Sequence, residues 1–295
     1  MEKKFLEMSN ETLAYLDFGG DKDPIILIHG NMSSSLHYSP IFSDLQEHFR
    51  VIAVDLRGFG DSSYNQSFNS CKELAADVKE FCDLLGLKEI AVVGWSAGAG
   101  VALEMAIAYP DLVRRLFSIE GVGYTGFPIL KKDENGQMLA GQFYSTKEEM
   151  AADPVQIAPV VALLASGNAA VMSAIWDATI YTVNKPDPAD NEIWMAETMK
   201  QRCLIDIDWA LANFNLANTP NGYNPGDDSL AKILCPCAFT AGDKDIVIPP
   251  GPFSPAATVA AIGAKATLIE YSDCGHSPLV DVKDQLVADI IAFCK

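Results

Sequence analysis

The sequence of 295 residues predicts an α/β fold in which a mostly parallel, doubly wound sheet of eight strands carries an inserted α-helical cap. Short apolar runs alternate with helical patterns along most of the chain. This alternation is typical of parallel strands that are covered by helices on both faces. The alternation stops after residue 122 and resumes at residue 231. We therefore predict a core domain of residues 1–122 and 231–295 and a helical cap, or lid, of residues 123–230.

The strands are expected from short apolar runs bounded by turn residues. Residues 4–18 are predicted to form two antiparallel edge strands with a turn near Asn10. Six further strands are expected at Ile25–Ile28, Val51–Val54, Ile90–Val93, Leu116–Ile119, Ala238–Thr240 and Thr267–Ile269.

The helices are expected from the 3.6-residue period of apolar side chains. Residues 71–85 keep this period over four turns, with Ser70 as a suitable N-cap and Gly86 just beyond the C-terminus. The last helix is expected at 282–294. In the cap, helices are expected at 147–152, 154–165, 168–181, 190–203 and 206–217.

The charge balance excludes several classes of partner. The chain has 39 acidic and 21 basic residues, a net charge of −18. Nucleic-acid binding requires clustered Lys and Arg, and an anionic membrane surface repels so acidic a protein. We therefore expect a small-molecule substrate, no nucleic-acid or membrane partner, and a monomer or homodimer.

The His and Cys residues offer no metal site. No two of the four His lie within four residues of each other, and the seven Cys lack the paired spacing of a zinc site. An odd number of Cys in a long chain favours reduced thiols, and the N-terminus lacks a signal-peptide pattern. We expect a cytoplasmic protein that requires neither a metal nor a cofactor.

The sharpest signal is the G-x-S-x-G sequence Gly94–Gly98, which lies between an apolar strand and a predicted helix from Ala97 to Tyr109. So tight a turn strains the backbone of Ser96 and requires small neighbours. It lifts the hydroxyl clear of the sheet and places it at a helix N-terminus, where the dipole favours developing negative charge. We predict a nucleophile; the alternative is a Gly-rich structural turn.

A serine nucleophile requires a base, and His276 is the best of the four candidates. It lies in a loop between the last strand and the last helix. We expect His48 at the surface and His29 to shape a loop, whereas His37 is open to two interpretations, lining the pocket or packing.

The acid that orients the base is expected at the end of an earlier strand. The loop 241–249 contains two candidates, of which we favour Asp245 and expect Asp243 to form the turn. Glu120 is a further candidate, with a pocket wall or a buried hydrogen-bonding carboxylate as the alternatives.

The chain order Ser96, Asp245, His276, together with the serine turn, resembles the α/β-hydrolase fold superfamily. Three further segments resemble pieces of that family: its oxyanion loop at His29–Met32, its D-x-R-G-x-G-x-S segment at Asp55–Ser62 and its histidine loop at Gly275–His276. These matches cover residues 12–122 and 231–295 and leave the cap unmatched.

The resemblance implies an oxyanion hole made by the backbone N–H groups of Asn31 and Ala97. The substrate pocket is expected to include His29, His37, Trp95 and Glu120. Haloalkane dehalogenases and soluble epoxide hydrolases resemble the chain at its His-Gly-Asn loop but need a carboxylate where Ser96 stands. A serine there points to acyl transfer instead.

The sequence therefore predicts a cofactor-independent serine hydrolase of the carboxylesterase or lactonase kind, with an acyl-enzyme on Ser96. An excess of acidic residues in the cap favours a small-to-medium, uncharged ester, thioester or lactone as the substrate. A carbon–carbon bond hydrolase or an amide hydrolase would use the same triad. A ligand receptor built on the hydrolase fold is an alternative from a different class.

Overall fold

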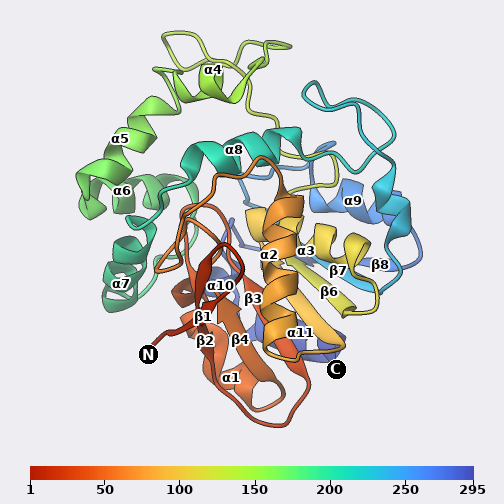
Figure 1. The fold of residues 1–295 in the computed structure, drawn as a ribbon. Coiled ribbons are helices and arrows are strands. Elements are labelled where there is room, and N and C mark those ends of the chain that lie inside the picture. The colour runs from red at the N-terminus through yellow and green to blue at the C-terminus, as the bar shows by residue number, and fades with distance from the viewer.

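The computed structural model describes residues 1–295 as an open sheet of eight strands with helices on both faces (Figure 1). The strands are β1 Lys4–Glu7, β2 Thr12–Asp17, β3 Pro24–Ile28, β4 Arg50–Val54, β5 Ile90–Trp95, β6 Val113–Ile119, β7 Cys237–Gly242 and β8 Ala266–Tyr271. Their order is β1-β2-β4-β3-β5-β6-β7-β8. Only β2 runs antiparallel to its neighbours, and the other pairs are parallel. The predicted fold class is confirmed.

Helices bury the two faces of the sheet in two apolar cores. One face is covered by α2 Cys71–Leu84, α3 Ala97–Ala108 and α9 Pro255–Ile262, and the other by α1 Phe42–Gln46, α10 Pro278–Asp281 and α11 Lys283–Cys294. Because side chains alternate along a strand, Ile26 and Ile28 enter the first core and Ile25 and Leu27 the second. This double burial explains why the strands are continuously apolar.

Local capping explains the bounds of α2. The Ser70 hydroxyl accepts a hydrogen bond from the backbone N–H of Glu73, as expected of an N-cap. Gly86, just beyond the helix, has φ +66°, a conformation in which glycine carries no steric cost. Both terminal residues were predicted correctly.

Five helices lie between β6 and β7, where the cap was predicted: α4 Lys147–Ala151, α5 Ala158–Ser166, α6 Ala169–Thr179, α7 Pro188–Thr198 and α8 Leu204–Asn213. Four of the five begin at residues other than those predicted, and local hydrogen bonding explains two of these differences. The carboxylate of Asp153 accepts the N–H groups of Val155 and Gln156 and holds a turn, so α5 begins later. Asp187 caps α7, which therefore begins at Pro188.

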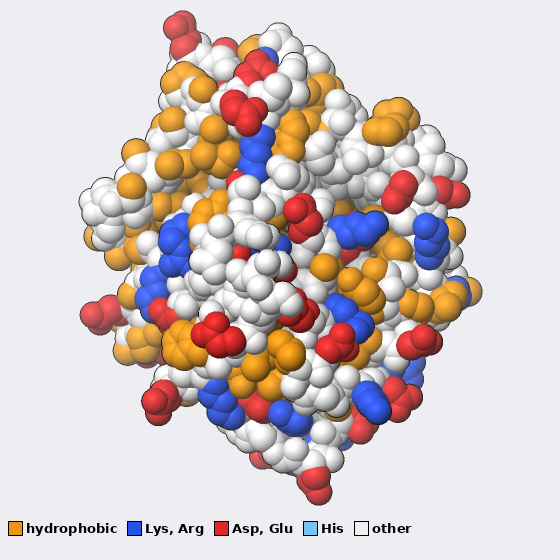
Figure 2. Space-filling view, in the orientation of Figure 1, with side chains coloured by type: hydrophobic (Ala, Val, Ile, Leu, Met, Phe, Trp, Pro, Cys, Tyr) orange, Lys and Arg blue, Asp and Glu red, His pale blue; other side chains and the backbone are white.

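The helices α4–α8 lie together beyond one end of the sheet (Figure 1). Hydrophobic side chains gather on this face of the molecule over α4, α5 and α8 (Figure 2). α8 packs on α2 and α3, and its residues Ile207 and Leu211 belong to the first apolar core. The division of the chain into a core domain and a cap therefore remains a prediction.

A buried ion cluster joins the N-terminus to α7. The ammonium of Lys3 lies 2.7 Å from Asp55, 2.8 Å from Asp61 and 2.5 Å from Glu197. These three carboxylates are close enough together to be candidate metal ligands, but the lysine occupies the space between them. Burial alone would lower the pKa of Lys3, yet the facing charge of Asp55 and the hydrogen bonds raise it above its ordinary value.

Lys3→Met is expected to lower the free energy of unfolding by about 3–5 kcal/mol, because it leaves the buried Asp55 without its counter-charge, whereas Asp61 and Glu197 keep their ion pairs with Lys200. Urea unfolding at neutral pH measures the effect. Lys4→Met is the matched control, because Lys4 is half exposed and lies 3.7 Å from Asp17; its expected cost is below about 1 kcal/mol. Equal effects of the two substitutions would contradict this account.

All seven Cys are unpaired and buried, where they pack as small apolar side chains. Burial raises the pKa of the Cys71 and Cys294 thiols, which keeps them protonated and unreactive. None of the helices combines the length and the hydropathy that a membrane span needs.

Candidate active site

Ser96 occupies the sharp turn between β5 and α3. Its backbone has φ 53° and ψ −118°, a conformation that side chains with a Cβ rarely adopt. The flanking glycines allow the strand and the helix to meet: a Cβ on Gly94 would lie 2.4 Å from the carbonyl oxygen of Gly98, and one on Gly98 would lie 2.2 Å from that of Ile28. The small residues in this motif are thus required by close backbone contact.

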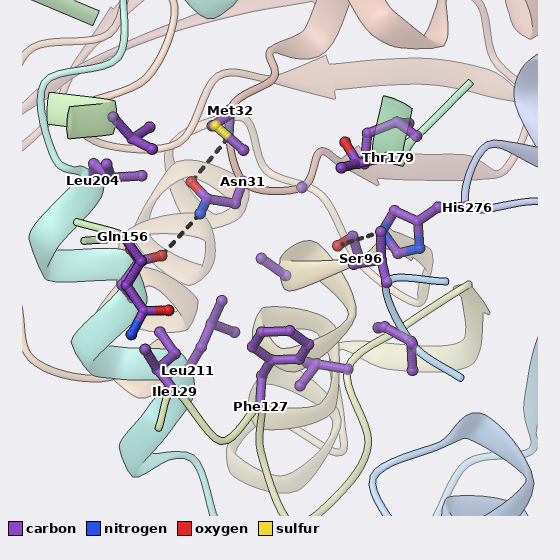
Figure 3. A pocket seen from close by; sticks show the side chains of 18 of the residues that line it. Asn31, Met32, Ser96, Phe127, Ile129, Gln156, Thr179, Leu204, Leu211 and His276 are labelled. Atoms are coloured by element: carbon purple, nitrogen blue, oxygen red, sulfur yellow. Dashed lines mark hydrogen bonds between the residues drawn. The ribbon is translucent and has the colours of Figure 1, made fainter. Parts of the chain in front are cut away.

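The three residues predicted as a triad lie in hydrogen-bond contact. The Nε2 atom of His276 lies 2.9 Å from the Ser96 hydroxyl, and the two side chains point toward one another (Figure 3). Its Nδ1 atom lies 2.8 Å from Oδ2 of Asp245. The indole N–H of Trp95 donates to the backbone oxygen of His276 at 2.9 Å, which fixes the histidine loop against the end of β5.

Asp245 is held as a carboxylate. Burial would raise its pKa, but the facing His276 and the backbone N–H groups of Val247 and Ile248 hold it below the ordinary value. The neighbouring Asp243 is exposed, and its carboxylate accepts the backbone N–H of Cys274. The two aspartates of this loop therefore differ in surroundings as the sequence suggested.

Glu120 lies behind this pair at the end of β6. Its carboxyl accepts hydrogen bonds from the Thr240 hydroxyl and from the backbone N–H of Gly242, both at 2.9 Å. Burial, together with the charge of Asp245, raises the pKa of Glu120 to about 8. At neutral pH Glu120 is therefore protonated, and it makes no hydrogen bond with His276.

Glu120→Gln is expected to change how stability depends on pH. Since the folded state raises the pKa of Glu120, it binds the proton more tightly than the unfolded chain, and stability falls as the pH rises from about 4.5 to 8. The glutamine removes this loss, on the order of a few kcal/mol. Urea unfolding at about pH 5, 7 and 9 tests this, with the exposed Glu270→Gln as control. Parallel pH curves for wild type and Glu120→Gln would refute the assignment.

The loop after β3 passes directly against the serine turn. A Cβ on Gly30 would lie 2.9 Å from the Cβ of Ser96. The next residue, Asn31, and the first residue of α3, Ala97, both line the cavity above Ser96. Their backbone N–H groups donate to no other group of the protein, so both are free to donate to a bound oxygen.

Ser96 lies at the wall of a cavity of about 470 Å³. Of its 26 lining residues, 17 are hydrophobic. Side chains from the segment between β6 and β7, including Phe127, Ile129 and Leu211, form much of the wall (Figure 3). The cavity is therefore apolar, with its polar groups confined to a few positions.

Of the four residues expected in the pocket, only Trp95 lines the cavity; His29, His37 and Glu120 do not. His29 lies beneath the loop, where its Nε2 atom accepts the backbone N–H of Leu56 at 3.0 Å. Glu120 faces the far side of the triad, as described above. The side chains of His29 and Glu120 both turn into the protein rather than into the cavity.

His37 packs instead of lining the pocket. Its ring stacks on Trp194 at 5.6 Å between centroids and tilts against Trp176 at 5.2 Å. Its Nδ1 atom accepts the backbone N–H of Ser34, and burial holds the pKa well below the ordinary value. His48, expected at the surface, is partly buried beside Phe49.

Four polar side chains of the cavity were not predicted from the sequence: Lys132, Gln156 before α5, Thr179 at the end of α6, and Asp208 on α8. A signal for Asp208 was present, because the segment Leu204–Asn213 carries two aspartates in an otherwise apolar helix. Its periodicity alone could not show which aspartate faces the active site.

Comparisons with known proteins agree with this fold. A family model described as alpha/beta hydrolase fold matches residues 23–156. Ethanol acetyltransferase 1 of Cyberlindnera jadinii is 37% identical over 100 residues, which are 33% of this chain and 30% of that protein. The soluble epoxide hydrolase of a Corynebacterium species is 37% identical over 101 residues, 34% of this chain and 35% of that protein. The chain thus matches only about a third of the length of these relatives.

A solved esterase from Exiguobacterium antarcticum superposes with a TM-score of 0.73 and covers 99% of both chains, at 18% sequence identity. At this identity the likeness concerns the fold alone. Together with the family model over residues 23–156 and the eight-stranded sheet, it shows that the chain has the α/β-hydrolase fold.

Proposed function

We propose that the protein is a serine hydrolase that cleaves a small-to-medium, uncharged carboxylic ester, thioester or lactone. The observation that carries this proposal is the chain of contacts from Asp245 through His276 to Ser96 beside an apolar cavity. Nucleophile, base and orienting acid are then within hydrogen-bond reach of one another, as acyl transfer requires.

In the proposed acylation step, the Ser96 hydroxyl oxygen attacks the substrate carbonyl carbon while Nε2 of His276 takes the hydroxyl proton. The N–H groups of Asn31 and Ala97 stabilise the oxyanion, a contribution on the order of 10²–10³ in rate. The bond to the leaving group then breaks, and His276 gives its proton to the departing oxygen or sulfur. Asp245 holds the imidazole in the required tautomer and stabilises its positive charge.

In the proposed deacylation step, water attacks the acyl-enzyme carbonyl and loses a proton to His276. The second tetrahedral intermediate collapses, the carboxylic acid leaves, and the proton returns to the Ser96 oxygen. The reaction therefore consumes one water and requires no group other than these side chains.

The cavity supports the proposed substrate class. Its volume of about 470 Å³ lies in the range of small-molecule sites, and its walls are mostly hydrophobic. An uncharged substrate suits such a wall, because a charged group would lose its hydration there. The relatives named as an acetyltransferase and an epoxide hydrolase, and the structurally similar esterase, support a hydrolase or an acyltransferase in general.

A second candidate function is acyl transfer to an alcohol. It is favoured by the match of about a third of the chain to an ethanol acetyltransferase. The acyl-enzyme would be the same, and an alcohol rather than water would accept the acyl group.

A panel of phenyl esters, thioesters and lactones, assayed with and without added ethanol, tests both functions. We expect the free acid as the main product and little ethyl ester. Mainly ethyl ester would favour the transferase. Turnover of amides with little ester cleavage would favour an amide hydrolase, and turnover of vinylogous diketones would favour a carbon–carbon bond hydrolase. Ligand binding without turnover would favour a receptor.

We also propose a cytoplasmic location and a monomer or homodimer with no partner other than its substrate. The location rests on seven unpaired cysteines, since free thiols are typical of a reducing compartment. The core and cap division at residues 122 and 231 belongs to this proposal too, with the cap selecting the substrate.

A further inference from the structure

Asp208, on α8, is the single acidic residue among those that line the cavity. Its Oδ1 atom accepts a hydrogen bond from the side-chain amide of Asn31 at 3.0 Å. The carboxyl makes no other hydrogen bond and no ion pair within the protein, so Oδ2 has no protein partner beside the cavity.

Asp206, two residues earlier on the same helix, provides the contrast. Its carboxylate accepts the Tyr64 hydroxyl at 2.6 Å and the backbone N–H of Phe68 at 2.9 Å, and it pairs with Lys147 at 2.5 Å. The fold thus satisfies the first aspartate fully and leaves the second nearly without partners.

Leaving Asp208 so poorly partnered has an energetic cost. Burial, opposed only by the Asn31 contact, raises the pKa of Asp208 to about 7. A carboxyl beside an apolar cavity disfavours its own charged form, and buried polar groups are otherwise hydrogen-bonded. A costly group that faces a proposed active site points to a role in binding.

The oxyanion loop places Asp208 relative to the reacting atoms. The side-chain oxygen of Asn31 accepts the backbone N–H of Met32 at 2.9 Å and the amide of Gln201 at 2.8 Å. These contacts fix the Asn31 side chain with its amide N–H toward Asp208. Asp208 is therefore hydrogen-bonded to the side chain of Asn31, the residue whose backbone N–H is proposed to bind the oxyanion.

The direction of the acyl chain follows from the proton path. Asn31 and His276 lie on opposite sides of Ser96 in Figure 3. The leaving group must face His276, because that residue gives it a proton. Since the carbonyl oxygen is held by the backbone N–H of Asn31, the acyl chain takes the remaining direction, which we assign to the part of the cavity that Asp208 lines.

We propose that Asp208 binds a hydroxyl group on the acyl chain of the substrate, so that the enzyme prefers hydroxyacyl esters to the matching alkyl esters. Oδ2 accepts the hydrogen bond of the substrate hydroxyl, which replaces the missing partner. A hydroxyl suits this position better than an ammonium group, because Lys132 lines the same cavity. This inference rests on the proposed serine hydrolase activity.

Two pairs of phenyl esters test the proposal. Each pair replaces a hydroxyl by a methyl group of similar size: 3-hydroxybutanoate against 3-methylbutanoate, and 6-hydroxyhexanoate against heptanoate. The ratio of kcat/KM within a pair is expected to be roughly 10–100 in favour of the hydroxy ester for at least one pair. In Asp208→Leu that ratio is expected to fall to about 1.

The ratio separates substrate binding from a purely structural role. Loss of the Asn31 contact would disturb the oxyanion loop and lower both rates of a pair alike. Asp208→Asn keeps an acceptor for Asn31 but presents an amide to the cavity, so we expect it to lower the ratio as well. Asp206→Asn is the matched control, expected to lower stability and leave the ratio unchanged.

The outcomes distinguish this inference from the function on which it rests. Equal rates within both pairs for wild type, or an unchanged ratio in Asp208→Leu, would overturn the role of Asp208 and leave the hydrolase standing. If wild type cleaved none of the four esters, and none of the broader panel, the proposed function would fail and this inference with it.

Discussion

Ser96→Ala is expected to lower kcat for ester hydrolysis by roughly 10⁴–10⁶, the largest effect of any substitution in the protein. The substitution removes the hydroxyl oxygen that forms the acyl-enzyme, and no neighbouring group can replace it. Residual hydrolysis would come from the oxyanion donors and the cavity alone. Steady-state kinetics on the best phenyl ester measure the effect.

Ser118→Ala is the matched control for this prediction. Ser118 is a buried serine on β6, directly beside Gly94 of β5, and its hydroxyl has no hydrogen-bond partner. Removing that hydroxyl is expected to leave kcat within about threefold of wild type, because it neither touches the triad nor leaves another group unpaired. Similar losses in both variants would show that packing near the serine turn, rather than nucleophilic attack, controls the rate.

Asp245→Asn is expected to lower kcat by about 10⁴, the second largest effect. An asparagine can donate to Nδ1 of His276, which favours the tautomer that places a proton on Nε2. That tautomer cannot take the proton of Ser96. The shape of the site is nearly unchanged, so KM for the same ester is expected to stay within a few fold of wild type.

Asp243→Asn provides the comparison for the second prediction. Asp243 lies in the same loop, is exposed, and contacts a backbone N–H rather than His276. Its substitution is expected to lower kcat less than about tenfold. A larger loss in Asp243→Asn than in Asp245→Asn would reverse the assignment of the acid within this loop.

Much of the proposed active site could be predicted because its signals are local. The turn around Ser96 is determined by consecutive residues: glycine is required at positions 94 and 98, because a Cβ at either would lie only 2.2–2.4 Å from a backbone carbonyl oxygen. The strands were predicted well for a related reason, since burial on both faces makes them continuously apolar. His276 and Asp245 follow from their places after strands in a parallel sheet, where loops meet at one edge.

What could not be predicted depends on side-chain direction and on contacts between distant segments. His29 and His37 lie next to the oxyanion loop in sequence, yet His29 turns under the loop and His37 enters a cluster of tryptophans from the cap. Nothing in the local sequence determines these rotamers. For the same reason, only the folded chain separates Asp206, which pairs with Lys147, from Asp208, which faces the cavity.

The Lys3 cluster illustrates the same limit. Lys3 meets Asp55 from the end of β4 and Glu197 from α7, residues that are 52 and 194 positions away in the chain. Such ion pairs leave no periodic pattern in the sequence. They do explain how the N-terminal edge of the sheet and the helix α7 are both held to the loop that follows β4.

The most direct test of the central claim is covalent labelling of the wild-type protein with a fluorophosphonate, followed by intact mass and peptide mapping. Activation of Ser96 by His276 predicts one adduct per chain, located on the peptide that contains Ser96, and no adduct in Ser96→Ala. A wild-type protein that remains unlabelled, or that is labelled equally in the alanine variant, would contradict the account.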